Sequence, residues 1–140
     1  MGATAALPVG FYNKLKSVTT AGSVYAYVSG RIYQRQAPQD AALPLLVYQV
    51  ITDLPWRFFG KADIEAEVQV TIYAKFPEVT TGTQLDTAND VLFTLLDGAT
   101  LTLTGYAGAQ AMCIDRGTVE VDQDSSYAIS RWRVWANASA

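Results

Sequence analysis

Residue types that usually carry chemistry are scarce in this sequence. It has no histidine, one cysteine and no glycine-rich phosphate cradle. The single cysteine, Cys113, excludes an internal disulfide, and without histidine it has no imidazole base to activate it as a nucleophile. No apolar run approaches the length of about 18 residues that a membrane span needs. These absences point to shape and association as the function.

Charged residues are also few. They make up 16% of the chain, 13 acidic and 10 basic, and give a formal net charge of -3. The basic residues are scattered from Lys14 to Arg133, whereas tight phosphate binding needs clustered lysine and arginine. The sequence therefore has no basic cluster of the kind that binds nucleic acids. It also has no charged-then-apolar leader, so we expect no secretory signal and synthesis in the cytoplasm.

The length of 140 residues suits one domain. We expect a flexible N-terminal arm at residues 1–6, a single α+β domain at residues 7–136 and a C-terminal tail at residues 137–140. Because half of the residues are hydrophobic, the surface must include small residues and some apolar area. Such a surface suits an assembly component, and composition alone is equally compatible with an ordinary small domain.

Residues 62–96 are the most informative segment. Apolar and polar residues alternate from position 64 to 75, which predicts a strand with one buried face. Apolar residues at helical spacing from Leu85 to Leu96 then predict a helix that Asp97 and Gly98 end. This combination is a scaffold and not a site.

The rest of the chain supplies further elements around this scaffold. We expect a helix from residue 7, a short helical turn capped by Ser23, a strand at residues 43–51, a loop at residues 52–63 and three strands after residue 100. This order predicts an α+β fold: a mainly antiparallel β-sheet of about four to five strands with two to three helices packed on one face. The predicted core residues are Val68, Val70, Ile72, Leu92, Leu95, Trp132 and Val134.

The acidic residues offer little for catalysis. Glu65 and Glu67 share one face of a strand, as a glycosidase or metal-binding pair would, but like charges on an outer sheet face are more often simply solvated. Asp122 opens a stretch resembling a calcium loop, yet that stretch lacks the glycine and the terminal glutamate that such a loop needs. A small carboxylate-dependent enzyme is therefore a remote alternative.

Residues 54–61 are unusual for a predicted loop, since they include three large aromatic residues and two cations. In one interpretation the aromatic side chains fold back onto the sheet edge. In the other they anchor a protein contact, because Trp, Phe and Arg are enriched in interface cores. A sugar-binding platform has little to favour it. Two outward residues of the last strand invite the same interpretations, so the candidate interface residues are Trp56, Arg57, Phe58, Phe59, Arg133 and Trp135.

The whole pattern resembles the phage tail-completion family, the tail terminators of long-tailed bacteriophages. The resemblance extends from about residue 7 to residue 136 and is carried by apolar patterns. These are residues 28–33 (VSGRIY), 43–48 (LPLLVY), 67–74 (EVQVTIYA) and 131–136 (RWRVWA).

This resemblance implies a virion protein of the neck or tail end, with no catalysis and no cofactor. It implies a hexameric ring on the last ring of the tail tube, which ends growth at the length set by the tape-measure protein. The implied partners are other copies of the chain, the tail tube protein and the head-side connector or stopper protein. DNA would pass through the lumen without sequence-specific binding. The alternative is another connector component, an adaptor or stopper, or a tube-like subunit.

Overall fold

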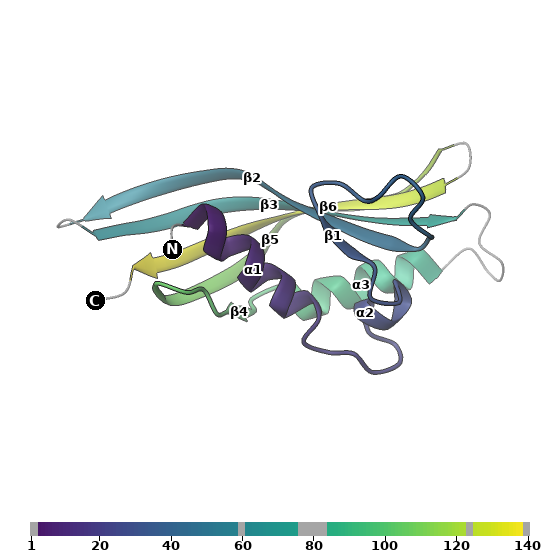
Figure 1. Ribbon diagram of the computed structural model, residues 1–140, viewed down its shortest axis with the longest axis horizontal. Coiled ribbons are helices and arrows are strands. Elements are labelled where there is room, and N and C mark those ends of the chain that lie inside the picture. Colours follow the sequence, from purple (N-terminus) through teal and green to yellow (C-terminus); the bar gives the residue numbers. More distant parts are fainter. Residues whose placement is uncertain (1–2, 59–60, 76–83, 123–124, 139–140) are drawn as a thin grey trace.

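A computed structural model describes residues 3–58, 61–75, 84–122 and 125–138. These residues form one sheet with helices lying along one of its faces (Figure 1). In chain order the elements are α1 (Ala3–Leu15), α2 (Val24–Tyr27), β1 (Ile32–Gln34), β2 (Leu45–Phe58), β3 (Lys61–Lys75), α3 (Gln84–Leu96), β4 (Thr100–Leu101), β5 (Tyr106–Asp122) and β6 (Ser125–Ala138).

The sheet has six strands in the order β1-β2-β3-β6-β5-β4. Strand β1 runs parallel to β2, and the other neighbouring pairs are antiparallel. The predicted α+β class is confirmed, with a mainly antiparallel sheet and helices on one face. The expected four to five strands fall short of six, because β1 and β4 are only three and two residues long. Such short strands exist through pairing with a neighbour and leave little periodicity in the sequence.

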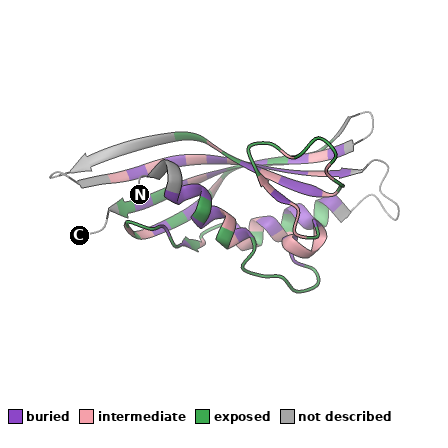
Figure 2. Ribbon diagram, in the orientation of Figure 1, coloured by how far each residue is buried: buried purple, intermediate pink, exposed green. Residues whose placement is uncertain are grey.

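The core lies between the sheet and the helices, and burial alternates along the long strands (Figure 2). On β3 the buried set runs from Ile64 to Ala74 at every second position, as the alternation predicts. Around Trp132 the contacts are specific: its indole Nε1 donates a 2.8 Å hydrogen bond to the Ser130 hydroxyl, and its ring lies 6.1 Å from that of Phe93. Satisfying this indole donor lets a large aromatic side chain occupy the interior.

The structure buries six of the seven predicted core side chains, each with at most 1% of its surface exposed. These are Val68, Val70, Ile72, Leu92, Trp132 and Val134. Leu95 is only half-buried, because the sheet-facing stripe of α3 passes through Leu92 and Leu96 instead. Helix α3 ends where the sequence indicates, and Gly98 after it has a φ of 72°, the left-handed region that favours glycine.

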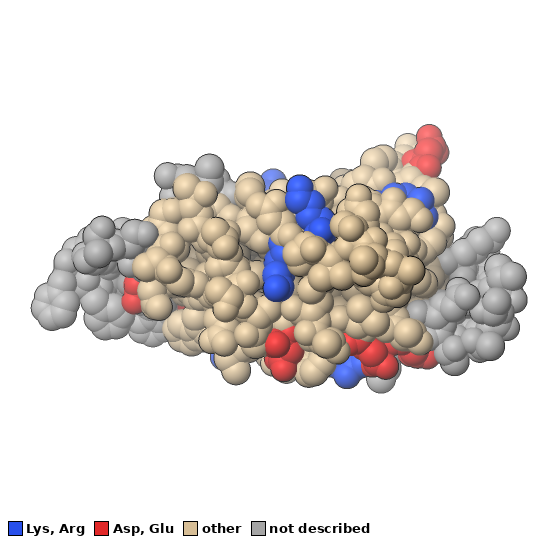
Figure 3. Space-filling view, turned by 90° about the horizontal axis from the view of Figure 1, so that it is seen from below, with Lys and Arg blue, Asp and Glu red and all other residues tan. Residues whose placement is uncertain are grey.

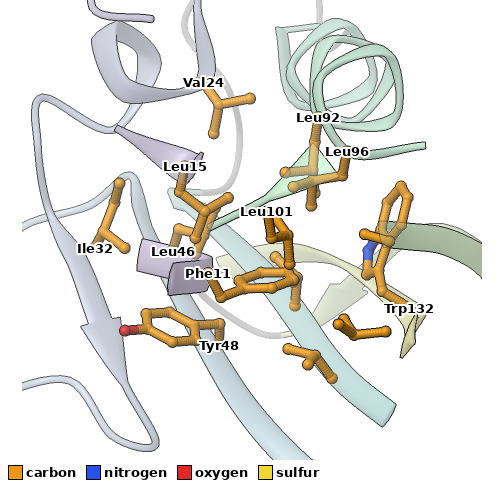
Figure 4. Close-up of a cluster of buried hydrophobic side chains, with 14 of the residues drawn as sticks. Phe11, Leu15, Val24, Ile32, Leu46, Tyr48, Leu92, Leu96, Leu101 and Trp132 are labelled. Atoms are coloured by element: carbon orange, nitrogen blue, oxygen red, sulfur yellow. The ribbon is translucent and has the colours of Figure 1, made fainter. Parts of the chain in front are cut away.

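Residues 3–6 are helical and so differ from the flexible arm expected at residues 1–6, whose first two residues lie outside the described part of the chain. Helix α1 begins at Ala3, and Ala6 is already buried. The helix is attached to the sheet by Phe11 and Tyr48, whose rings stack at 5.7 Å (Figure 4). The Tyr48 hydroxyl also donates a 3.1 Å hydrogen bond to the carbonyl of Pro8. The small residues at the chain start carry no pattern of their own, so this helix depends on tertiary contacts.

Close packing also fixes one glycine of α1. A Cβ at Gly10 would lie 2.2 Å from Leu103 Cδ2 and 2.7 Å from the carbonyl oxygen of Thr102. The helix therefore approaches the segment after β4 more closely than any side chain would allow. At the other end of the chain, β6 continues to Ala138, so the strand includes the first residues of the predicted tail.

Candidate functional site

The face of the sheet opposite the helices is the most distinctive surface of the molecule. The alternation that buries one side of β5 and β6 turns several large apolar side chains away from the core. Trp135 and Met112 are 44% and 51% exposed, and Ile129 is also exposed. A hollow of about 340 Å³ lies beside Trp135, between residues of β4, β5 and β6. Large exposed apolar side chains on one face are a feature of association surfaces.

An ion-pair cluster lies on the same face. Arg133 Nε is 3.1 Å from Glu65 Oε1, and Arg133 Nη2 is 3.8 Å from Glu67 Oε1. Arg133 stands opposite Glu67 in the β3–β6 register, so the contact follows directly from strand pairing. Although Arg133 Nε is buried, its approach to Glu65 lacks hydrogen-bond geometry, so the attraction is mainly electrostatic. Two of the three carboxylates of the remote enzyme hypothesis, Glu65 and Glu67, therefore pair with the guanidinium of Arg133.

The other candidate chemical residues have structural surroundings. Cys113 is half-buried on β5, and its backbone N–H donates a 3.0 Å hydrogen bond to Asp97 Oδ1 just beyond α3. Burial, followed by the negative charges of Asp97 and Asp115, raises the pKa of the Cys113 thiol. Since the thiolate is the nucleophilic form, a raised pKa disfavours a nucleophilic role for this sulfur.

Asp122 is the last residue of β5 and pairs with Ser125, the first residue of β6. Gln123 and Asp124, which complete the stretch compared with a calcium loop, lie outside the described residues. Among the side chains that the structure describes, no group of three His, Cys, Asp or Glu is arranged to hold a metal ion.

The predicted loop at residues 52–63 is wrong, because the chain is strand up to Phe58 and again from Lys61. The β2–β3 hairpin extends past the helices at one end of the molecule (Figure 1). In its register Trp56 partners Asp63, Arg57 partners Ala62 and Phe58 partners Lys61. Phe59 lies outside the described residues, as do the side chains of Trp56, Arg57 and Phe58. Pro55 does not stop β2, because a strand with a free outer edge tolerates a missing N–H donor.

The candidate interface residues thus belong to two places. Arg133 and Trp135 lie on the helix-free face, and the backbone of Trp56, Arg57 and Phe58 belongs to the hairpin end of β2. Sequence reasoning missed Met112 and Ile129. Met112 lies between the inward Ala111 and Cys113, but nothing in that alternation tells which of two apolar faces the helices will cover.

The helix side of the molecule is mostly uncharged, with basic groups near the middle and acidic groups along one edge (Figure 3). No helix in the described part of the chain is long and apolar enough to cross a membrane. A six-stranded sheet with one covered face, one partly apolar open face and an extended hairpin defines an α+β subunit suited to assembly.

Comparison with known proteins identifies the family to which the chain belongs. The chain matches the model of the family described as Tail completion protein gp17 over residues 15–138, and it belongs to that family. It is accordingly a structural virion protein of the phage tail-completion type. No curated protein sequence matches it significantly.

Solved structures share the fold. A chain from the virion of a native gene transfer agent (GTA) particle superposes with a TM-score of 0.72 at 14% sequence identity, covering 96% of this chain and 97% of that one. A second solved chain, which carries no functional name, superposes with a TM-score of 0.66 at 9% identity, covering 96% of this chain and 95% of its own length. At these identities the likeness concerns the fold alone.

Proposed function

We propose that this protein is a tail terminator: a ring, most simply a hexamer, that caps the tail tube and joins it to the head-side connector. The observation that carries the proposal is membership of the tail-completion family over residues 15–138. The similarity of fold to a chain of a gene transfer agent virion supports the same role.

The shape of the subunit is compatible with a ring. A closed ring of identical subunits needs a heterologous interface, in which two different surfaces of the same chain meet. The β2–β3 hairpin, which extends at one end of the molecule, and the helix-covered face provide such unlike surfaces (Figure 1). The exposed Trp135, Met112 and Ile129 on the helix-free face form a third surface, available to the tube or to the connector. Trp56, Arg57, Phe58 and Phe59 of the hairpin, together with Arg133 and Trp135, are the interface residues of this proposal.

In the proposed ring, DNA passes through the lumen without binding to its walls. Basic clusters facing a channel would bind phosphates and retard the genome. The net charge of -3 and the scattered lysines and arginines suit free passage. No catalytic role is included, since Glu65 and Glu67 both face Arg133 in an ion-pair cluster.

Native mass measurement with and without purified tail tubes tests the proposal. We expect a species of six times the subunit mass of 15.2 kDa, formed either alone or on the tube end. Tubes assembled in the presence of the protein should stop growing once capped. A chain that stays monomeric with tubes present contradicts the proposal, and a ring that binds isolated connectors but never tubes favours the stopper alternative.

A further inference from the structure

The charges of this chain are divided between the two lateral edges of the sheet. Strand β1 and the start of β2 form one edge, and β5 with β4 forms the other. Residues 3–48 supply the first edge and contain four cations and one acidic residue, which are Lys14, Lys16, Arg31, Arg35 and Asp40. Residues 84–122 supply the second edge and contain six acidic residues and one cation, which are Asp86, Asp90, Asp97, Asp115, Glu120, Asp122 and Arg116. We call these the basic edge and the acidic edge.

The segments between the two edges are close to neutral. Residues 49–75, which include the end of the β2–β3 hairpin, have four acidic residues and three cations: Asp53, Asp63, Glu65, Glu67, Arg57, Lys61 and Lys75. On β6, Arg133 pairs with Glu65 and Glu67. Arg131 stands opposite Asp115 in the β5–β6 register, so one carboxylate of the acidic edge has a cation across the strand pair. The separation of charge therefore lies between the edges and not along the hairpin.

The two longer helices repeat this division. Helix α1 packs mainly on β2, whereas α3 packs mainly on β5 and β6, so each helix covers a different half of the sheet. The charged residue within α1 is Lys14, and Lys16 follows the helix directly. The charged residues within α3 are Asp86 and Asp90, and Asp97 follows that helix directly. Figure 3 shows most acidic groups along the lower edge of this face and most basic groups in its middle and upper part.

The acidic groups of α3 form one outward stripe. Asp86, Asp90 and Asp97 are all exposed, and their spacing places them on the same side of the helix. Like charges one turn apart repel each other, and a cation in the last turn, which would stabilise the helix, is missing from α3. Asp90 has an ion pair with Arg116 of the same chain. A cationic surface on a second molecule would relieve the repulsion that the isolated subunit retains.

The cations of the basic edge lie at the surface with their charge accessible. Lys16 is exposed, and its Nζ lies 4.8 Å from the centroid of the Tyr12 ring. Arg31 donates a 2.9 Å hydrogen bond from Nε to the carbonyl of Pro44, and a neutral carbonyl does not compensate the positive charge. Arg35 is exposed directly after β1. This edge can therefore receive carboxylates from outside the subunit.

We infer that the acidic edge of one copy binds to the basic edge of the next copy in the ring. This inference rests on the proposed ring and names the surfaces that join neighbouring subunits. A second copy is the occupant because one chain presents both charges at opposite edges, which is the head-to-tail arrangement that a closed ring requires. A different partner of one charge would match only one of the two edges. Complementary charges also fix the register of a contact and speed its formation.

A charge exchange is the first test, with native mass measurement as the readout. We expect Asp86→Lys with Asp90→Lys to weaken assembly of the full chain about 30-fold, and Lys14→Glu with Lys16→Glu to weaken it about as much. Mixing the two variants should restore assembly, because chains with two basic edges then alternate with chains with two acidic edges. Gln69→Lys with Asn137→Lys adds positive charge on the helix-free face, away from both edges, and should assemble normally.

Salt dependence is a second test. Assembly of the wild type should weaken as the salt concentration rises, because exposed charges are screened. Asp86→Asn with Asp90→Asn removes the two charges with little change of shape, and it should make assembly less sensitive to salt. A purely structural role of these residues would lower the free energy of unfolding without changing how assembly responds to salt.

Cross-linking between copies locates the contact. In a Cys113→Ala background, chains with Thr94→Cys on the outward stripe of α3 are mixed with mass-tagged chains that have Ser17→Cys just after α1. A short bifunctional thiol reagent should join the two kinds of chain, and each chain then has a single cysteine. Asn137→Cys chains in place of the Thr94→Cys chains are the control and should not be joined.

The outcomes separate this inference from the proposed function. Rings that form without response to the charge changes or to salt, and without the cross-link, overturn the edge-to-edge contact and leave the terminator ring intact. Charge variants that form rings normally but no longer bind tubes or connectors also overturn it, because the charged edge then serves another partner. Failure of the wild-type chain to assemble, even on tail tubes, contradicts the proposed function itself.

Discussion

The two faces of the sheet are built from the same strands but have opposite characters. On the helix side of β6, Trp132 and Val134 are almost fully buried, and the indole nitrogen of Trp132 has a hydrogen-bond partner within the core. On the other side Trp135 is 44% exposed, beside the Arg133 ion-pair cluster. Alternation along one strand thus gives one surface that determines stability and another that is available to partners.

The largest expected effect is on the helix side. Trp132→Ala removes a fully buried ring, its contact with Phe93 and its hydrogen bond to Ser130. We expect it to lower the free energy of unfolding by about 3–5 kcal/mol. Urea denaturation followed by circular dichroism measures this loss. A loss below about 1 kcal/mol would show that the two faces do not differ in the way described.

The matched change on the open face is Trp135→Ala. Because this ring is 44% exposed, we expect unfolding to change by no more than about 0.5 kcal/mol. If the open face binds the tube or connector, binding to that partner should weaken by about 2 kcal/mol. Sedimentation with purified tubes and with connectors measures the change in binding free energy. Equal losses of stability and binding would assign Trp135 to the core instead.

Tyr48 tests the comparison of the two faces through its hydrogen bond and through the pH dependence of stability. Tyr48→Phe removes the donor to the Pro8 carbonyl, and we expect a loss of about 1 kcal/mol. Burial, followed by the neighbouring Tyr12, raises the pKa of Tyr48 to about 12 in the folded protein. The folded state therefore retains this proton more firmly than the unfolded state, whose tyrosine titrates near 10.

The sign of the pH effect follows from that difference. The contribution of Tyr48 is fully present below about pH 10 and is lost as the pH rises toward 12. Between about pH 10 and pH 12 the free energy of unfolding should therefore fall less steeply with pH for Tyr48→Phe than for the wild type. Parallel curves would contradict the assignment of Tyr48 as a buried, proton-retaining group.

The smallest expected effect concerns the ion pairs of the open face. Arg133 is 40% exposed and Glu67 30% exposed, so solvent screens their attraction. We expect Glu67→Gln to change the free energy of unfolding by less than about 1 kcal/mol. A thermal unfolding series in 0.05 to 1 M salt should show that most of this small term disappears on screening. A salt-independent loss of several kcal/mol would mean that the open face also contributes to the core.

The sequence predicts the two faces unequally for a physical reason. Period-2 alternation on β3 and helical spacing on α3 identify the buried side, since burial constrains every member of the pattern. The open side has no comparable constraint, so the exposure of Met112 and Ile129 became visible only in the structure. Of the predicted core residues, Leu95 alone is only half-buried, because α3 directs its side chain partly away from the core.

Tertiary pairing explains the other differences. Residues 52–58, which include Pro55, belong to the predicted loop at residues 52–63, yet pairing with β3 makes them strand. The small residues from Ala3 to Ala6 have no periodicity, and they are helical because α1 packs on the sheet. Sequence patterns reported the interior of this protein well, whereas its ends and its partner surfaces depend on contacts between distant segments.

The most direct test of the central claim is an image of the native particle at a resolution that traces this chain. We expect a single ring between the last ring of tube subunits and the head-side connector, with the helix-covered core intact in every copy, the hairpin in contact with a neighbouring copy and the open sheet face in contact with the tube or the connector. Copies distributed along the tube, or a position within the head shell, would contradict the assignment as a tail terminator.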